Sequence, residues 1–342
     1  MRRKLASIQR VLDIVPILKA DSIELVRING WQCVTKKGEF RVGDLGVFFE
    51  IDAIPPETEP FLFLWMPKNA QPGEAVVRPA KFRIRTMTLR GVLSQGLFMP
   101  FSTFGLEGVT AGDDVTERLG VGKYEPPPPA GMGEWRGPFP QIISKTDEMR
   151  VQSVPDVLQE LKHRPYAITM KYDGTSSTYL IHPQTAEFHA CSRNQSIRDG
   201  ANLYWEMARQ YDLEAVLRRS PHLAIQGEIV GPGIQKNPLG LKKRELFVFS
   251  VFDLQSLQFL GHDETRTALA MMGLSAVETL ERGDSFDYSQ QQLLALAEGK
   301  YPGTTNEREG IVIRAIPETF SPTLSSRLSF KAISNRYLLK EE

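Results

Sequence analysis

A run of four prolines near the middle of the chain places the strongest limit on how it can fold. Pro126 to Pro129 lie in a segment, residues 124–140, that also contains several glycines. This composition favours an extended linker over packed structure. The length of 342 residues also exceeds a usual single domain of roughly 100 to 200 residues. The sequence therefore predicts two domains, residues 1–122 and 141–342, joined by a linker at 123–140.

Composition excludes several classes of protein. The apolar share of 41% and the charged share of 24% are typical of a soluble globular chain. Arg10 and Asp13 interrupt what a signal peptide would need as an apolar core, and the apolar run 61–66 is too short to cross a bilayer. Cys33 and Cys191 offer neither a disulfide framework nor a zinc spacing. We expect a cytoplasmic protein without membrane association.

The first domain is expected to be a small β-barrel or sandwich. Strand-like runs at 23–34, 45–51, 80–89 and 92–99 are separated by glycine turns, and helical periodicity is largely absent. The 41 basic and 41 acidic residues cancel, so binding to nucleic acid would require a local basic face.

One such face is predicted in the run from Lys81 to Arg85. Lys81, Arg83 and Arg85 occupy alternate positions, so a strand would place all three cations on one side and Phe82 and Ile84 on the other. We expect these cations to contact nucleic-acid phosphates, although solvated surface charge is the plain alternative.

The second domain is expected to mix α and β structure. Residues 166–170, 223–229, 246–252 and 310–315 have the composition of strands. Residues 201–217 and 263–272 have the period of helices.

Chemistry first appears where an apolar strand ending at Met170 runs into Lys171-Tyr172-Asp173-Gly174. A K-x-D-G match alone is weak, because it arises by chance in roughly one chain in ten of this length. Taken alone, the motif could be a strand end with a turn and a solvated lysine. The segments that follow it in order make the difference: Ser192-Arg193-Asn194, Gly227-Glu228, the aromatic strand 246–253, Glu309-Gly310-Ile311-Val312-Ile313-Arg314 and Leu328-Ser329-Phe330-Lys331.

This order resembles the covalent nucleotidyltransferase superfamily of polynucleotide ligases and messenger-RNA capping enzymes. With the run 145–152 and the N-terminal barrel, the whole chain resembles the Deinococcus-type RNA ligases. The resemblance implies an α+β chain in which a small OB-like β-barrel precedes a mixed α/β nucleotidyltransferase domain of the ATP-grasp-like ligase type with antiparallel sheets.

The resemblance also implies an activity. It is the ATP-dependent joining of 5′-phosphate and 3′-hydroxyl ends through a lysyl-AMP intermediate, with Mg²⁺ or Mn²⁺ as cofactor. The implied partner is RNA or an RNA-containing nicked duplex, and no protein partner is inferred. Lys171 would be the nucleophile and Lys331 would neutralise the α-phosphate, while Asp173 and Glu309 would hold the metal ion. Because lysine attacks only as the free amine, we expect Lys331 and the metal ion to lower the pKa of Lys171.

The remaining roles concern the nucleotide and the RNA end. By resemblance, Glu228 would accept hydrogen bonds from ribose hydroxyls as an ionised carboxylate, and Phe252 would stack on adenine beside Met170. Arg150 would reach the β- and γ-phosphates, and Arg193 would bind the 5′-phosphate end. For Phe252 the alternative is ordinary core packing, and for each arginine it is a surface ion pair.

The sequence departs from the family pattern at one position. Several relatives carry two lysines at alternate positions in the last motif, whereas Ser329 stands here two residues before Lys331. If a second cation is needed after adenylation, Lys340, Arg336 or Lys236 would have to supply it.

Three other activities stay open as alternatives. They are a GTP-using capping-type guanylyltransferase, a DNA-preferring ligase and a non-catalytic nucleic-acid-binding module. In capping enzymes and DNA ligases the OB domain follows the catalytic domain, so the N-terminal barrel favours an RNA ligase.

Overall fold

The computed structural model describes residues 3–67, 77–125 and 131–340. The chain divides into two compact units, unit 1 of Met1–Pro126 with Leu338–Glu342, and unit 2 of Pro127–Tyr337. The proline run at 126–129 lies outside the described residues. No helix in the described ranges is long and apolar enough to span a membrane.

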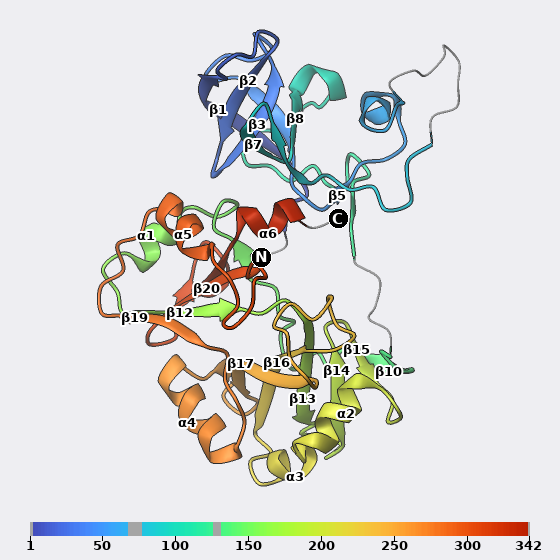
Figure 1. Ribbon diagram of the computed structural model, residues 1–342, viewed down its shortest axis with the longest axis vertical. Coiled ribbons are helices and arrows are strands. Elements are labelled where there is room, and N and C mark those ends of the chain that lie inside the picture. The colour runs from blue at the N-terminus through green and yellow to red at the C-terminus, as the bar shows by residue number, and fades with distance from the viewer. Residues whose placement is uncertain (1–2, 68–76, 126–130, 341–342) are drawn as a thin grey trace. The chain divides into compact units, whose positions relative to one another are not determined.

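Unit 1 is built around a five-stranded antiparallel sheet, which confirms the predicted β-rich first domain (Figure 1). Its order is β3-β2-β1-β4-β8, with β1 (Ala6–Pro16), β2 (Ile23–Ile28), β3 (Trp31–Lys36), β4 (Leu45–Phe49) and β8 (Leu97–Pro100). Two two-stranded pairs and two 3₁₀ helices complete the described part of unit 1: β5 (Ala53–Ile54) with β9 (Gly122–Lys123), β6 (Thr86–Leu89) with β7 (Val92–Gln95), η1 (Glu59–Leu64) and η2 (Phe101–Phe104).

The sheet of unit 1 curls so that its edge strand β3 meets β7. The backbone N–H of Val34 donates to Ser94 Oγ at 3.0 Å, and Gln32 Nε2 donates to the carbonyl of Leu93 at 2.7 Å. Alternate residues of β3 face inward, because successive side chains of a strand point to opposite faces. The curl encloses a core that contains Ile8.

The predicted strand 80–89 is correct only from Thr86 onward. Residues 82–85 run outside any strand, so the expected strand face of three cations does not form. Ile84 instead exchanges backbone hydrogen bonds with Asp52 and Ala53. Arg83 Nε lies 3.5 Å from Asp52 Oδ1, and its guanidinium stacks over Tyr124 at 4.2 Å. The charge of Arg83 therefore already has a partner.

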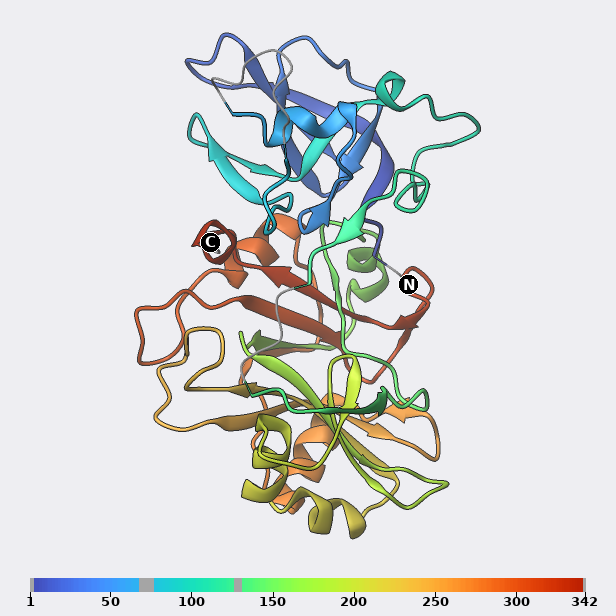
Figure 2. The same cartoon turned by 90° about the vertical axis from the view of Figure 1, so that its right-hand side faces the viewer.

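Unit 2 contains two larger sheets, which confirms the mixed domain with antiparallel sheets (Figure 2). The seven-stranded sheet has the order β10-β15-β14-β13-β16-β17-β18, with β10 (Trp135–Pro138), β13 (Thr175–Ile181), β14 (Phe188–Ser192), β15 (Gln195–Ile197), β16 (Leu223–Val230), β17 (Glu245–Asp253) and β18 (Gln258–Phe259). The five-stranded sheet has the order β11-β23-β20-β12-β19, with β11 (Met149–Arg150), β12 (Tyr166–Lys171), β19 (Thr279–Gly283), β20 (Gly310–Ala315) and β23 (Ser329–Ile333). A short pair joins β21 (Phe320–Ser321) to β22 (Ser326–Arg327). β10 lies inside the stretch predicted to be a linker and pairs with β15.

Five helices of unit 2 pack on the sheets, and a sixth leads toward the C-terminus: α1 (Val157–Leu161), α2 (Leu203–Gln210), α3 (Leu213–Arg218), α4 (His262–Met272), α5 (Gln290–Ala297) and α6 (Asn335–Lys340). The helix predicted at 263–272 is confirmed as α4. The one predicted at 201–217 is two helices, because Asp212 adopts a left-handed backbone with φ 48°.

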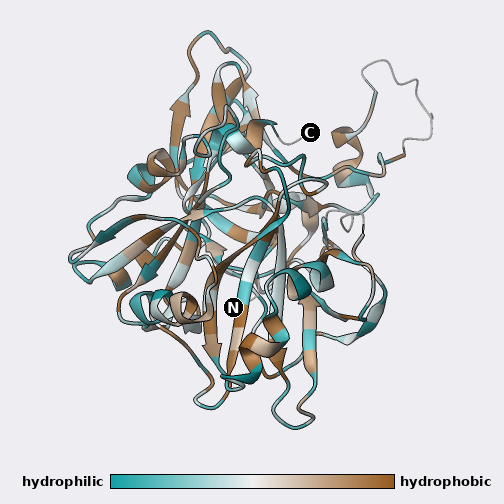
Figure 3. Cartoon of the chain, turned by 60° about the horizontal axis from the view of Figure 1, so that its bottom comes forward, coloured by the Kyte–Doolittle hydropathy of each residue, from teal (hydrophilic) through white to brown (hydrophobic). Residues whose placement is uncertain are grey.

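The helices of unit 2 pack in two groups, one on each of its two large sheets. Residues of α2, α3 and α4 join one apolar core with the seven-stranded sheet, and residues of α1 and α5 join another with the five-stranded sheet. Hydrophobic stretches follow the strands, while hydrophilic residues dominate the loops (Figure 3). Two smaller apolar clusters, one containing Phe252 and one containing Met170, lie apart from these two cores.

A close approach of strands β20 and β23 fixes the position of the predicted Glu309-Gly310 motif. A Cβ added at Gly310 would overlap the carbonyl oxygen of Ala332 on β23. Forcing atoms into a packed site costs about 1 to 3 kcal/mol. We therefore expect Gly310→Ala to lower the free energy of unfolding by about that amount in a denaturant titration. Gly137→Ala is the matched control in a strand, because a Cβ there meets nothing within 4 Å. Equal stability of the two variants would contradict the close approach.

Candidate active site

The predicted nucleophile ends a buried strand. Lys171 is the last residue of β12, which lies between β19 and β20. Its partner across the ladder is Gly310, so Glu309 lies beside it, and Lys171 Nζ donates to Glu309 Oε2 at 2.8 Å. A Cβ at Gly174 would overlap the carbonyl oxygen of Ile229, so the turn after Lys171 packs directly on β16.

Three carboxylates surround Lys171. Burial by itself would lower the pKa of the lysine, but the charges of Glu309, Glu228 and Asp173 outweigh it and raise that pKa above its ordinary value. The expectation that cations lower this pKa is therefore not met by the protein alone. Lys331, one of the cations expected to lower this pKa, pairs with Asp147 at 3.4 Å.

Glu228 has a raised pKa. Burial, followed by the neighbouring charges of Glu309 and Asp173, raises this pKa to about 8, against the opposing effect of Lys171. The shift favours the protonated form of the carboxyl, whereas the sequence led us to expect the ionised form. A protonated carboxyl can donate one hydrogen bond and accept another.

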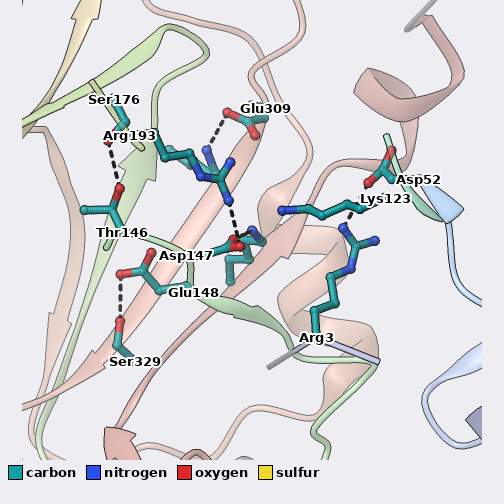
Figure 4. Close-up of polar contacts among 12 residues, drawn as sticks. Arg3, Asp52, Lys123, Thr146, Asp147, Glu148, Ser176, Arg193, Glu309 and Ser329 are labelled. Atoms are coloured by element: carbon teal, nitrogen blue, oxygen red, sulfur yellow. Dashed lines mark hydrogen bonds and ion pairs between the residues drawn. The ribbon is translucent and has the colours of Figure 1, made fainter. Parts of the chain in front are cut away.

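A second cluster gathers the predicted phosphate-binding cations around Asp147. Arg193, which follows β14, places Nη2 2.7 Å from Asp147 Oδ2 (Figure 4). Lys331 contacts the other oxygen of the same carboxylate. Arg150 stands opposite Lys331 in the parallel pair of β11 and β23. The fold therefore brings together all three predicted cations, and Asp147 was not predicted.

Ser329 stands at the position where several relatives carry a lysine, and a cation from a neighbouring strand lies beside it. The cation beside Ser329 is Arg314 on the neighbouring strand, with Nε 3.3 Å from Ser329 Oγ. Of the three substitutes named from the sequence, Arg336 lies 3.7 Å from Glu298. Glu148 accepts a hydrogen bond from the Ser329 hydroxyl at 3.3 Å (Figure 4) and pairs with Arg314 at 3.2 Å.

Phe252 is a core residue in this structure. It is buried among Leu180, Cys191 and Ala224 and meets Phe259 edge to face at 4.9 Å. Phe247 lies opposite Glu228 in the ladder of β16 and β17 and belongs to the apolar cluster that contains Met170. A register irregularity at Gln226/Gly227 shifts the ladder between Phe247 and Phe252.

The remaining predicted residues are Lys81, Arg83 and Arg85, which belong to unit 1. Lys81 and Arg85 are exposed, whereas the Arg83 side chain is only 9% exposed. Another residue that the sequence did not single out is Tyr301, whose hydroxyl contacts the backbone of both Asp173 and Glu309.

The carboxylates near Lys171 fit a divalent cation held partly by other ligands. Asp173 and Glu309 offer oxygen donors, which Mg²⁺ and Mn²⁺ prefer. In the part of the chain that the structure describes, no group of three or more His, Cys, Asp or Glu side chains could hold a metal ion. Water and substrate phosphates would complete the coordination, as is usual for Mg²⁺.

Comparison with protein families agrees with this architecture. An OB-fold domain model matches residues 5–101, and an RNA ligase model matches residues 164–333. None of the curated proteins compared with the sequence matches it. The chain belongs to the RNA ligase family, with an N-terminal OB fold followed by the ligase domain.

Among solved structures the chain is similar to an RNA ligase from Naegleria gruberi. A lysine-to-alanine mutant of that enzyme with ATP and Mn is 36% identical, with 99% of each chain covered and a TM-score of 0.87. The same enzyme with PPi gives a TM-score of 0.88 at the same identity and coverage. A glutamate-to-alanine mutant with AMP and Mn gives the same values as the PPi structure.

The ion pairs of Glu148 predict how stability depends on pH. Burial opposes ionisation, but Arg314, Arg327 and Lys331 lower the pKa of Glu148 from 4.5 to about 2. A carboxylate with a lowered folded pKa stabilises the protein above pH 4.5, and this contribution is lost as the pH falls from 4.5 toward 2. The shift corresponds to about 3 kcal/mol.

We therefore expect Glu148→Gln to destabilise the protein at neutral pH by about 3 kcal/mol. The difference from the native protein should shrink as the pH falls below 4.5. Urea titrations from pH 7 to pH 3 measure it. Glu214→Gln, which breaks only an exposed pair with Arg218, is the control. A difference between Glu148→Gln and the native protein that does not change with pH would contradict the assignment.

Proposed function

We propose that the protein is an ATP-dependent RNA ligase that seals 5′-phosphate and 3′-hydroxyl ends, specifically nicks in duplexes whose 3′-hydroxyl strand is RNA. The observation that carries the proposal is Lys171 held 2.8 Å from Glu309 at the end of β12, within a chain of the RNA ligase family. The solved relatives with ATP, AMP and PPi support ATP as the nucleotide.

In the first step Lys171 Nζ attacks the α-phosphorus of ATP. A P–N bond forms, the bond between the α-phosphorus and the bridging oxygen breaks, and pyrophosphate leaves. The ammonium must first lose a proton, and its pKa is raised by the surrounding carboxylates. Asp173 and Glu309 would hold Mg²⁺ or Mn²⁺, which when bound neutralises those carboxylates and the phosphate charge.

The nucleotide lies between the two sheets of unit 2 in this proposal. Glu228 binds the ribose hydroxyls, and Met170 with Phe247 packs on adenine in the place first assigned to Phe252. Lys331 neutralises the α-phosphate, and Arg150 binds the β- and γ-phosphates. Phosphate oxygens take over the ion pair that Asp147 makes with Lys331 and Arg193.

In the second step a 5′-phosphate oxygen of the RNA attacks the lysyl-AMP phosphorus, and the P–N bond breaks. In the third step the 3′-hydroxyl attacks the 5′-phosphate and AMP leaves. Arg193 orients the 5′-phosphate with its planar fork of donors. Arg314 supplies the cation that the family pattern places at Ser329.

The OB-fold domain binds the nucleic acid, with Lys81 and Arg85 as phosphate contacts. Arg83 has a lesser share, because it pairs with Asp52. An OB fold ahead of the ligase domain supports membership of the Deinococcus-type branch. Phosphate contacts of this kind position the duplex without reading its sequence.

Intact-mass spectrometry after incubation with a nucleotide and Mn²⁺ tests the proposal. We expect a mass gain of one AMP with ATP, none with GTP, and complete loss of the adduct in Lys171→Ala. Lys162→Ala is the control, because Lys162 is exposed and its ion pair with Asp287 is long, at 3.9 Å. Sealing of nicks with all four combinations of RNA and DNA strands then defines the substrate.

Other results of this experiment point to other functions. A GMP adduct would favour the capping-type reaction. No adduct with either nucleotide and any metal would favour a nucleic-acid-binding module.

A further inference from the structure

Tyr301 lies at the junction of the two segments that carry the proposed metal ligands. Its side chain is buried, with 1% of the residue exposed. Its hydroxyl donates to the carbonyl of Lys171 at 3.1 Å and accepts the backbone N–H groups of Asp173 at 2.9 Å and Glu309 at 3.1 Å.

These three bonds use the full capacity of a phenol. A tyrosine hydroxyl has one proton to donate and two lone pairs to accept with. Phenylalanine at this position would keep the ring but leave two buried N–H donors and one carbonyl without their partner. Buried backbone groups are rarely left so, and the local backbone would therefore shift.

Hydrogen bonds to the backbone fix the loop that carries Tyr301. Tyr301 belongs to the loop between α5 and β20, where a bridge joins Lys300 to Glu307. Its backbone N–H donates to the carbonyl of Asn306 at 3.1 Å, and Thr304 Oγ1 donates to its carbonyl at 3.0 Å. The hydroxyl therefore holds the backbone of the turn after Lys171 and the backbone of Glu309 in fixed positions relative to each other.

We infer that Tyr301 is a positioning residue for adenylation. By tying the backbone of Asp173 to that of Glu309, it holds the two carboxylates at the spacing needed to share one divalent cation beside Lys171. Tyr301 itself touches neither the metal nor the nucleotide. The inference rests on the proposed function for the identity of the metal ligands.

Tyr301→Phe tests the inference, with Tyr179→Phe as the matched control. Tyr179 is also fully buried in unit 2, and its hydroxyl donates to the carbonyl of Tyr204 at 3.1 Å and not to the backbone that carries the carboxylates. Mn²⁺ binding in the presence of AMP is measured by electron paramagnetic resonance, at a temperature where circular dichroism shows each variant folded.

We expect Tyr301→Phe to weaken Mn²⁺ binding by about 10- to 100-fold, as losses around metal ligands commonly do. Tyr179→Phe should bind Mn²⁺ as the native protein does. The rate of self-adenylation by Tyr301→Phe should recover as Mn²⁺ is raised, a rescue that general destabilisation would not give. Native Mn²⁺ affinity in Tyr301→Phe, or an equal loss in both variants, would overturn the inference.

Two further arrangements keep the result decisive. If Tyr301→Phe does not fold, Thr304→Val is the second variant. It removes the bond that Thr304 Oγ1 donates to the Tyr301 carbonyl and the bond that it accepts from the backbone N–H of Asn306, and it should show the same loss to a smaller degree. Native affinity in Thr304→Val would then overturn the inference. If the native protein binds Mn²⁺ with AMP but forms no lysyl-AMP, the proposed function fails while the comparison of Mn²⁺ affinities still decides the role of Tyr301.

Discussion

The antiparallel register between β12 and β20 is the constraint on which the candidate active site depends. It pairs Lys171 with Gly310 and so places Glu309 within hydrogen-bonding distance of the lysine. β23 pairs on the other side of β20 and sets Lys331 opposite Val312. Because strand side chains alternate, a slip of one residue would turn Lys171 toward the apolar core that contains Ile168 and the helices.

Charge in the site is arranged as two neighbouring clusters of opposite sign. Carboxylates gather around Lys171, and cations gather around Asp147. Each cluster has one ion of opposite charge at its centre, which offsets part of the cost of burying like charges together. In the proposed reaction a divalent cation meets the carboxylates and phosphates meet the cations. Substrate binding then replaces ion pairs within the protein by ion pairs with the metal ion and the phosphates. Without these ligands the carboxylates keep the pKa of Lys171 raised.

Several residues show where sequence reasoning reached its limit. The motif order located Lys171, Glu228 and Glu309, and the structure brings them together. It could not show that Arg314 stands beside Ser329, because that contact comes from strand pairing across 15 residues. It assigned Phe252 to adenine with core packing as the alternative, and the buried position of that ring depends on strand pairing that an aromatic-rich strand does not reveal. The alternation at 81–85 predicted a strand, but Ile84 is held by Asp52 and Ala53 instead.

The sequence by itself determined the class of the protein, the strands that carry the motifs and the chemical type of each candidate residue. These depend on local patterns, such as an apolar strand ending in Lys171, that can be read directly from the order of residues. Only the tertiary structure decided which charges are paired, that burial raises the pKa of Glu228, and that Tyr301 joins Asp173 to Glu309. These properties depend on distances between residues far apart in the chain, and burial makes each of those distances count in the energy of the site.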